Sequence, residues 1–269
     1  MSTGRSQKRQ RKKERRHARR EEITRYVRRR RRQRLLILLG SFGALAAIAL
    51  AVLYVVRSPS EPAATPAASA EAGTVKVPTQ EPVACDAELP RAAGSTKQQY
   101  PEPEDQKLDP DSTYKLILNT SCGDVEITLD VQRAPKTSNS IVFLARKGFF
   151  DGTFFHRIAP QFVIQGGDPT GSGSGGSGYK VTEAPPDDLT YQEGVVAMAK
   201  AGAEAAGTSG SQFFIVSGSG GESLTPDYAL LGEVTEGMDV VEEIMRTGTA
   251  DGTPPRAYTY IERALIVEE

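Results

Sequence analysis

The most constraining feature of the chain is a run of 22 residues without a charged side chain, from Leu35 to Val56. A helix needs about 20 mostly apolar residues to cross the hydrocarbon core of a bilayer. Such a helix satisfies its backbone hydrogen bonds internally, which is the condition for a segment to lie in lipid. The run therefore predicts a transmembrane helix over residues 35–56, and it separates the chain into parts that fold independently.

Charge differs sharply between the two sides of this run. Residues 1–34 hold 17 Lys and Arg against three acidic residues, whereas the rest of the chain holds 16 against 31. Basic residues accumulate on the cytoplasmic side of a membrane helix. We therefore expect a single-pass protein of the cell membrane, with a cytoplasmic N-terminus and everything after Arg57 on the outer side.

A cleaved signal peptide is the alternative, because Ala68-Ser69-Ala70 resembles a cleavage site. However, the apolar run is longer than the roughly 7–15 residues of a signal sequence, and the small-residue motif lies well beyond its end. Both observations favour a retained anchor.

The basic arm, residues 1–34, could bind either of two kinds of partner. Contact with anionic lipid is worth about 1 kcal/mol for each basic residue near the surface. Arginine-rich segments also bind nucleic acids. The arm contains a single aromatic residue, Tyr26, and no motif of a folded module. We therefore expect membrane lipid, and no nucleic acid, as its partner.

Residues 57–111 have the composition of a linker. They hold nine of the 17 prolines, with many Ala, Glu and Thr and few large apolar side chains. Such a segment buries too little apolar surface to offset the entropy of ordering it. We expect a disordered spacer that gives the following domain reach from the membrane.

The folded domain is expected over residues 112–269, which suffice for one good core. Alternation predicts a hairpin of Tyr114–Asn119 and Val125–Leu129, and Pro135 begins a helical stretch. Many short strands with only two helices favour an antiparallel barrel. The remaining strands are expected at Thr153–Ile158, Phe162–Gly166, Val195–Ala199, Phe213–Val216, Ala229–Val234 and Ile261–Val267, and the second helix at Met238–Met245.

Two stretches place polar side chains in otherwise apolar strands. Residues 154–168 read Phe-Phe-His-Arg-Ile-Ala-Pro-Gln-Phe-Val-Ile-Gln-Gly-Gly-Asp, and residues 210–216 read Gly-Ser-Gln-Phe-Phe-Ile-Val. Burying such groups without partners is costly, so Arg157 and Gln165 indicate a functional site. Together the two stretches resemble the core motifs of the cyclophilins, which are peptidyl-prolyl cis-trans isomerases. The resemblance spans roughly residues 114–268.

The resemblance implies a mostly β fold, a closed eight-stranded antiparallel β-barrel capped by two α-helices. It makes Arg157 the catalytic residue, and the implied chemistry needs no cofactor and no metal. The main chain at Ala199 and Lys200 would pair with the substrate. The residues implied to bind the substrate peptide are Phe162, Val163, Gln165, Ala199, Lys200, Gln212, Phe214, Leu224 and Tyr228.

Three positions depart from the usual form of the family. Lys200 stands for an asparagine, Ser223 for a tryptophan, and Tyr228 for a histidine of the pocket. Because the arginine, phenylalanines and glutamines match the motif, we expect an active isomerase for prolines of unfolded exported proteins, acting as a monomer. A catalytically weak module that only binds proline-containing segments is the alternative.

The chain has only two cysteines, Cys85 and Cys122, and no histidine close to either in sequence, which argues against a zinc cluster. An oxidising compartment permits a disulfide between them, and the sequence leaves open whether it forms. His156 is expected to be a packed strand residue, because no nucleophile motif accompanies it. The Gly- and Ser-rich residues 171–178 predict a flexible surface loop.

Overall fold

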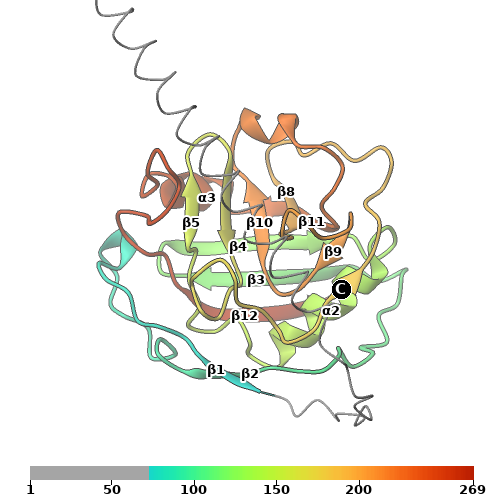
Figure 1. Ribbon diagram of the computed structural model, residues 1–269, viewed down its shortest axis with the longest axis horizontal. Coiled ribbons are helices and arrows are strands. Elements are labelled where there is room, and N and C mark those ends of the chain that lie inside the picture. The colour runs from blue at the N-terminus through green and yellow to red at the C-terminus, as the bar shows by residue number, and fades with distance from the viewer. Residues whose placement is uncertain (1–72) are drawn as a thin grey trace, which may run out of the picture. The chain divides into compact units, whose positions relative to one another are not determined.

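A curled antiparallel sheet dominates the computed structural model, which describes residues 73–269 (Figure 1). Its eight strands are β3 (Tyr114–Thr120), β4 (Gly123–Leu129), β5 (Arg157–Ala159), β6 (Val163–Gly166), β8 (Val195–Met198), β10 (Phe213–Val216), β11 (Leu230–Glu236) and β12 (Ile261–Glu268). Their order across the sheet is β12-β3-β4-β11-β8-β10-β6-β5, and every neighbouring pair is antiparallel. The mostly β fold predicted from the sequence is confirmed.

The sheet curls on itself but does not close as a full barrel. In Figure 1 the strands β3, β4 and β12 run across the direction of β5 and β10. The two edge strands, β5 and β12, do not pair with each other in a ladder. The segments just before them are joined by one isolated bridge, between Phe154 and Tyr260. The strand expected at Thr153–Ile158 forms only as Arg157–Ala159, and Pro160, which has no backbone N–H to donate, follows it. The expectation of a closed barrel is corrected to a curled sheet joined by one bridge.

Both helices begin where the sequence predicted. The helix α2 (Pro135–Arg146) has proline in its first turn, and α3 (Met238–Met245) follows Gly237, whose φ is 90°. The longer helix packs against β12, and the shorter one against β4, β5 and β6. Two further pairs of short strands lie outside the main sheet: β1 (Thr74–Lys76) with β2 (Thr96–Gln98), and β7 (Val181–Thr182) with β9 (Thr208–Ser209). The short 3-10 helices are η1 (Ala84–Asp86) and η2 (Ser219–Ser223).

The strand β10 is buried on both faces of the sheet. Phe213 and Ile215 belong to the main core, whereas Phe214 and Val216 belong to a second, smaller apolar cluster. This explains why the strand reads as a continuous apolar run rather than an alternating one. The second cluster is the part of the fold that forms the candidate site.

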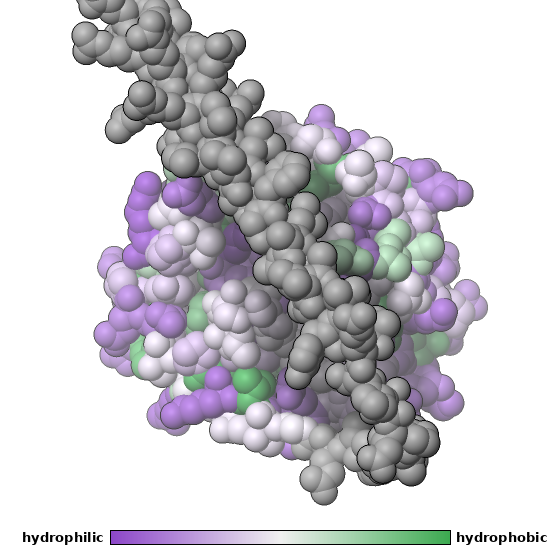
Figure 2. Space-filling view, in the orientation of Figure 1, coloured by the Kyte–Doolittle hydropathy of each residue, from purple (hydrophilic) through white to green (hydrophobic). Residues whose placement is uncertain are grey.

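The described residues belong to one compact unit with its own core, so this part is expected to fold by itself. Hydrophilic residues cover much of the face visible in Figure 2. Among residues 73–269 the exposed large apolar side chains are Leu89 and Val267.

Residues 73–111 form a strap that packs on the rest of the domain, which corrects the expectation of a disordered linker for this segment. Val77 is fully buried, and the ring of Tyr100 meets that of Phe143 edge-on with centroids 4.9 Å apart. The hydroxyl of Tyr260 accepts a hydrogen bond from the Gln80 amide and donates one to the Gln80 carbonyl. Composition alone underestimated this segment because a few well-placed apolar contacts and a covalent link suffice to order it.

The covalent link is a disulfide between Cys85 in η1 and Cys122 in the β3–β4 turn, with Cα atoms 5.3 Å apart. Of the alternatives that the sequence left open, the structure therefore selects the paired cysteines. The bridge joins the strap to the hairpin across 37 positions of sequence.

Within residues 73–269 no helix is both long and apolar enough to cross a membrane. The span predicted at residues 35–56 and the basic arm lie outside the described residues, as do positions 57–72 of the expected linker.

Candidate active site

Strand register brings the two sequence motifs together. In the β5–β6 ladder Arg157 lies opposite Gln165, and in the β6–β10 ladder Gln165 lies opposite Phe214. Val163 and Gln165 are two positions apart on β6, so their side chains share a face of the sheet. The polar residues that stood out in the sequence are therefore cross-strand neighbours on one surface.

This surface is hollowed into an apolar cavity of about 240 Å³. Nine of the ten site residues predicted from the sequence line it, and the tenth, Gln212, lies beside it: the lining comprises Arg157, Phe162, Val163, Gln165, Ala199, Lys200, Phe214, Leu224 and Tyr228. Phe214 and Tyr228 meet edge-on, with ring centroids 5.3 Å apart and an interplanar angle of 89°. The cavity thus has aromatic walls and polar groups at its rim, the usual make-up of a small binding site.

Arg157 is half-buried, and its guanidinium carbon lies 5.5 Å from the centre of the Phe162 ring. A guanidinium over an aromatic face is attracted to the ring by a cation–π interaction, and its N–H groups can still donate hydrogen bonds. The packing therefore holds a permanently charged hydrogen-bond donor at the edge of an apolar cavity.

Gln165 is held by a second glutamine. Its Nε2 donates to Oε1 of Gln212 over 3.0 Å, and Nε2 of Gln212 donates to the carbonyl of Gly175 over 2.9 Å. The amide of Ala199 in turn donates to the Gln212 carbonyl over 2.9 Å. Gln212 therefore links the site to the loop of residues 171–178.

That loop is anchored rather than flexible, which corrects the sequence-based expectation. The carboxylate of Asp168 accepts hydrogen bonds from the amide and hydroxyl of Thr170 and from the amides of Gly173 and Gly175. Burial opposes ionisation of Asp168, but the hydrogen bonds from Thr170 and Gly175 outweigh it and lower the pKa of this carboxyl. An aspartate just before a glycine-rich turn is the sequence signal for such an arrangement.

Lys200 is folded back against the domain instead of reaching into solvent. Its side chain is 4% exposed, and Nζ lies 3.2 Å from a carboxylate oxygen of Asp227 and 5.8 Å from the centre of the Tyr228 ring. The same Nζ donates to the carbonyl of Glu204 over 3.0 Å. The lysine that stands for the usual asparagine therefore forms part of the cavity wall.

His156 is a packed residue, as the sequence analysis favoured. It is 6% exposed, and neither ring nitrogen has a hydrogen-bond partner among the residues that the structure describes. Burial lowers the pKa of its imidazole, and the nearby Asp168 offsets this only in part. A buried imidazole without a hydrogen-bonded nucleophile has no role as a general base.

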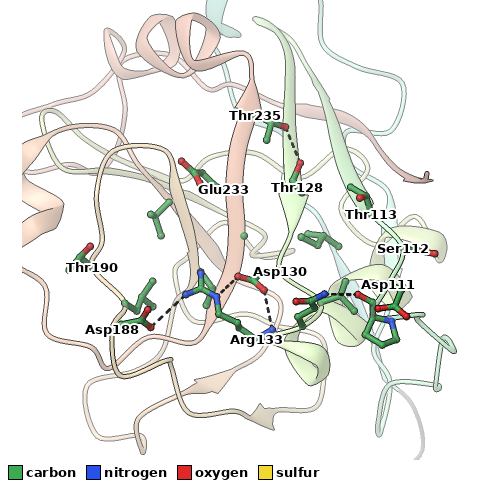
Figure 3. Close-up of a pocket in the computed structure, with 18 residues that line it drawn as sticks. Asp111, Ser112, Thr113, Thr128, Asp130, Arg133, Asp188, Thr190, Glu233 and Thr235 are labelled. Carbon is green, nitrogen blue, oxygen red and sulfur yellow. Dashed lines mark hydrogen bonds and ion pairs between the residues drawn. The ribbon is translucent and has the colours of Figure 1, made fainter.

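A second cavity, of about 490 Å³, lies over β4 and β11 and contains none of the predicted site residues. Figure 3 shows Arg133 between Asp130 and Asp188, and the guanidinium bonds the Asp130 carboxylate over 2.6 Å. The arginine of this cavity is thus taken up by two aspartates of the same lining. Although larger, this cavity is the weaker candidate.

Sequence reasoning missed one residue near the site, Gln99 of the strap. It lines another cavity, which adjoins the apolar one. No local pattern could have found it, because a glutamine in a proline-rich segment carries no signal.

Comparisons with known proteins agree with this geometry. Residues 115–265 match the family described as cyclophilin type peptidyl-prolyl cis-trans isomerase/CLD. The chain is 37% identical over 169 residues to peptidyl-prolyl cis-trans isomerase-like 1 of Gibberella zeae, covering 58% of this chain and 97% of the relative. It is 38% identical over 175 residues to peptidyl-prolyl cis-trans isomerase A of Mycobacterium tuberculosis, covering 58% and 94%.

Solved structures show the same similarity. A crystal structure of a Cryptosporidium parvum cyclophilin type peptidyl-prolyl cis-trans isomerase, determined in the presence of the dipeptide Ala-Pro, matches with a TM-score of 0.53 and 28% identity. The match covers 58% of this chain and 99% of that one. On the family match and these relatives, the chain belongs to the cyclophilin-type peptidyl-prolyl cis-trans isomerases.

Proposed function

We propose that this isomerase accelerates rotation about X–Pro bonds in unfolded exported proteins, on the outer side of the membrane, with Arg157 as the catalytic residue. The observation that carries the proposal is the cross-strand placement of Arg157 and Gln165 at the rim of the apolar cavity. Each part of that arrangement answers one need of the reaction.

The reaction needs no covalent chemistry. Amide resonance opposes rotation with a barrier of about 18–20 kcal/mol, and uncatalysed exchange at proline takes tens to hundreds of seconds. At the top of the barrier the amide is twisted, and the prolyl nitrogen becomes pyramidal and gains a lone pair. A donor placed at that nitrogen binds the twisted amide better than the planar one, which is the condition for catalysis.

Arg157 is suited to this role because its guanidinium stays protonated and carries several donors in a fixed plane. Phe162, Val163, Phe214 and Leu224 line the same cavity and would receive the proline ring. Gln165 would hold the peptide backbone beside the ring. Because the amide of Ala199 already donates to Gln212, we assign the peptide contact at Ala199 to its carbonyl.

The cellular setting is inferred from the N-terminal sequence. The charge-free run at residues 35–56, with the basic arm before it, favours a retained anchor and a cytoplasmic N-terminus. The disulfide between Cys85 and Cys122 is typical of an oxidising compartment and supports an outer location for the domain.

Exchange NMR tests the activity. An Ala-Pro peptide is mixed with catalytic amounts of residues 69–269, and the exchange between its cis and trans signals is measured with and without protein. We expect exchange far above the uncatalysed rate. Peptide binding without acceleration would refute the enzymatic mechanism and select the alternative, a module that only binds proline-containing segments.

Fractionation tests the location. The full-length protein is expected in the membrane fraction, and its domain is expected to be digested by protease added to intact cells. A domain that is protected until the cells are lysed would overturn the outer location without affecting the isomerase assignment.

A further inference from the structure

Another cavity, of about 560 Å³, adjoins the apolar one and shares Gln165, Ala199 and Lys200 with it. An extended peptide whose proline fills the apolar cavity would continue through this shared wall. The rest of its lining comes from separate parts of the chain and includes two further glutamines, Gln99 of the strap and Gln212, and the loop residues Gly175 and Gly176.

The strap reaches this cavity through Gln99, whose position is fixed at both ends. Its backbone amide donates to the Gly73 carbonyl over 2.7 Å, and its side-chain Nε2 donates to the Gly176 carbonyl over 3.1 Å. The next amide, of Tyr100, donates to the Ser177 carbonyl over 2.8 Å. Two consecutive strap residues therefore hold two consecutive loop residues.

The contact is close enough to require glycine in the loop. A Cβ at Gly178 would lie 2.8 Å from the Tyr100 carbonyl oxygen and 2.9 Å from Cβ of Gln99. The φ of Gly178 is 95°, which side-chain-bearing residues rarely adopt. The loop is therefore shaped to receive the strap.

A continuous set of hydrogen bonds runs from the strap to the site. Gln99 bonds Gly176, the neighbouring Gly175 carbonyl accepts from Gln212, and Gln212 accepts from Gln165. The strap lies before residue 115, where the match to the family begins. One wall of the substrate cleft thus comes from outside the family domain.

Each charged side chain that lines this cavity has a partner of opposite charge. Lys180 pairs with Glu204, and Lys200 pairs with Asp227. What remains are the amides of three glutamines, which both donate and accept hydrogen bonds. An apolar side chain placed among them would displace their water without replacing its hydrogen bonds, which is unfavourable.

We propose that Gln99 is a specificity-determining residue, contributed by the strap, which selects substrates with an uncharged, hydrogen-bonding side chain close to the proline. The inference rests on the proposed function, because it takes the apolar cavity as the site of the proline ring. Of the three glutamines that line this cavity, Gln99 is the one that lies outside the family domain.

Affinity measured against a small peptide panel tests the proposal. Alanine-based peptides with a single proline carry Asn or Leu two positions before or two positions after it, and their dissociation constants for residues 69–269 are measured by NMR titration. We expect the better-bound Asn peptide to bind roughly five- to tenfold more tightly than its Leu counterpart, the value of about one hydrogen bond. In Gln99→Ala this ratio should fall to within about twofold, for the same reason.

Gln98→Ala is the matched control, since this neighbouring glutamine is exposed and does not line the cavity. It should keep the parental ratio. Should Gln99→Ala fail to fold, Gln99→Glu preserves side-chain length while removing the donor to Gly176, and it should also lower the ratio. A ratio of affinities does not depend on the fraction of folded protein, so general destabilisation would not imitate the expected result.

A parent domain without preference, or a preference that survives in Gln99→Ala, overturns the proposal. Catalysis is assayed separately by exchange. If the domain binds with the expected preference but does not accelerate exchange, the specificity inference stands and the isomerase assignment falls.

Discussion

Arg157 and Gln165 are direct partners in the β5–β6 ladder. Arg157 presents a charged donor and Gln165 an amide to the same apolar cavity, although eight positions separate them in sequence. The pairing explains why two polar side chains in apolar strands are tolerated, since both lie at the rim of a cavity rather than inside the core.

Removing the guanidinium should abolish most catalysis. In Arg157→Ala the twisted amide loses its charged donor, and kcat/KM should fall about 10²–10³-fold, as for the loss of one transition-state donor elsewhere. Arg157→Lys keeps the charge but not the planar fork, so an intermediate loss is expected. Exchange NMR measures the rate. Arg133→Ala, in the cavity of Figure 3, is the matched control and should behave like the parent; equal losses in both variants would contradict a catalytic role.

Gln212→Glu should lower the activity, because it removes a hydrogen bond that holds the loop of residues 171–178 against the site. A carboxylate still accepts from Gln165 but no longer donates to the Gly175 carbonyl, which leaves that carbonyl facing a negative charge. We expect kcat/KM to fall roughly tenfold, the value of one hydrogen bond with its partner unsatisfied. Faster amide hydrogen exchange in residues 171–178 should accompany the loss. Gln132→Glu, at the other cavity, should change neither quantity.

Loss of the disulfide should destabilise the domain. Closing a loop of 37 positions restricts the unfolded chain by roughly 3–4 kcal/mol on the entropic account. In Cys85→Ser/Cys122→Ser the melting temperature should therefore drop on the order of 10 °C, measured by calorimetry. Reductant should lower the melting temperature of the parent and leave the double variant unchanged. A parent insensitive to reductant under unfolding conditions would mean that the cysteines are not joined in the purified protein.

Stability should fall as the solution is acidified below neutrality, because of His156. Burial lowers the pKa of this imidazole in the folded state, so the unfolded chain binds a proton first as pH drops. The stabilising effect is present above the unfolded pKa of about 6.5 and is lost as pH falls from there towards the folded pKa.

Urea unfolding between about pH 7 and about pH 5 measures this effect, since that interval brackets the unfolded pKa. In His156→Phe, which has no titrating group at this position, the free energy of unfolding should change less over this pH interval. Asp168, whose folded pKa is lowered, contributes only at more acidic pH. Parallel profiles for parent and variant would show that another group is responsible.

Much of the fold followed from local pattern. The helices at Pro135 and Met238 and the strand Phe213–Val216 begin where the sequence predicts, because proline placement and apolar periodicity act within a few residues. The short edge strand β5 was overestimated, because pairing at the end of a curled sheet depends on which strand lies beside it. A run of residues that favour strands does not show which strand will lie beside it.

The site residues followed from motif resemblance, and nine of them line one cavity. Two expectations failed for the same reason. The strap was read as disordered and the glycine-rich loop as flexible, yet each is ordered through contacts with the other and with the sheet. The composition of a segment shows how much apolar surface it can bury by itself. It does not show which contacts a distant segment will make with it.

The sequence by itself determined that the chain has a charge-free apolar run, that a mostly β domain follows, and that Arg157 and Gln165 stand apart from the apolar strands around them. These are properties of neighbouring residues. Only the tertiary structure decided that Cys85 meets Cys122 and that Gln99 reaches the loop at Gly176, 77 positions away. Such contacts arise when the sheet curls and brings remote segments side by side, and no local pattern encodes them.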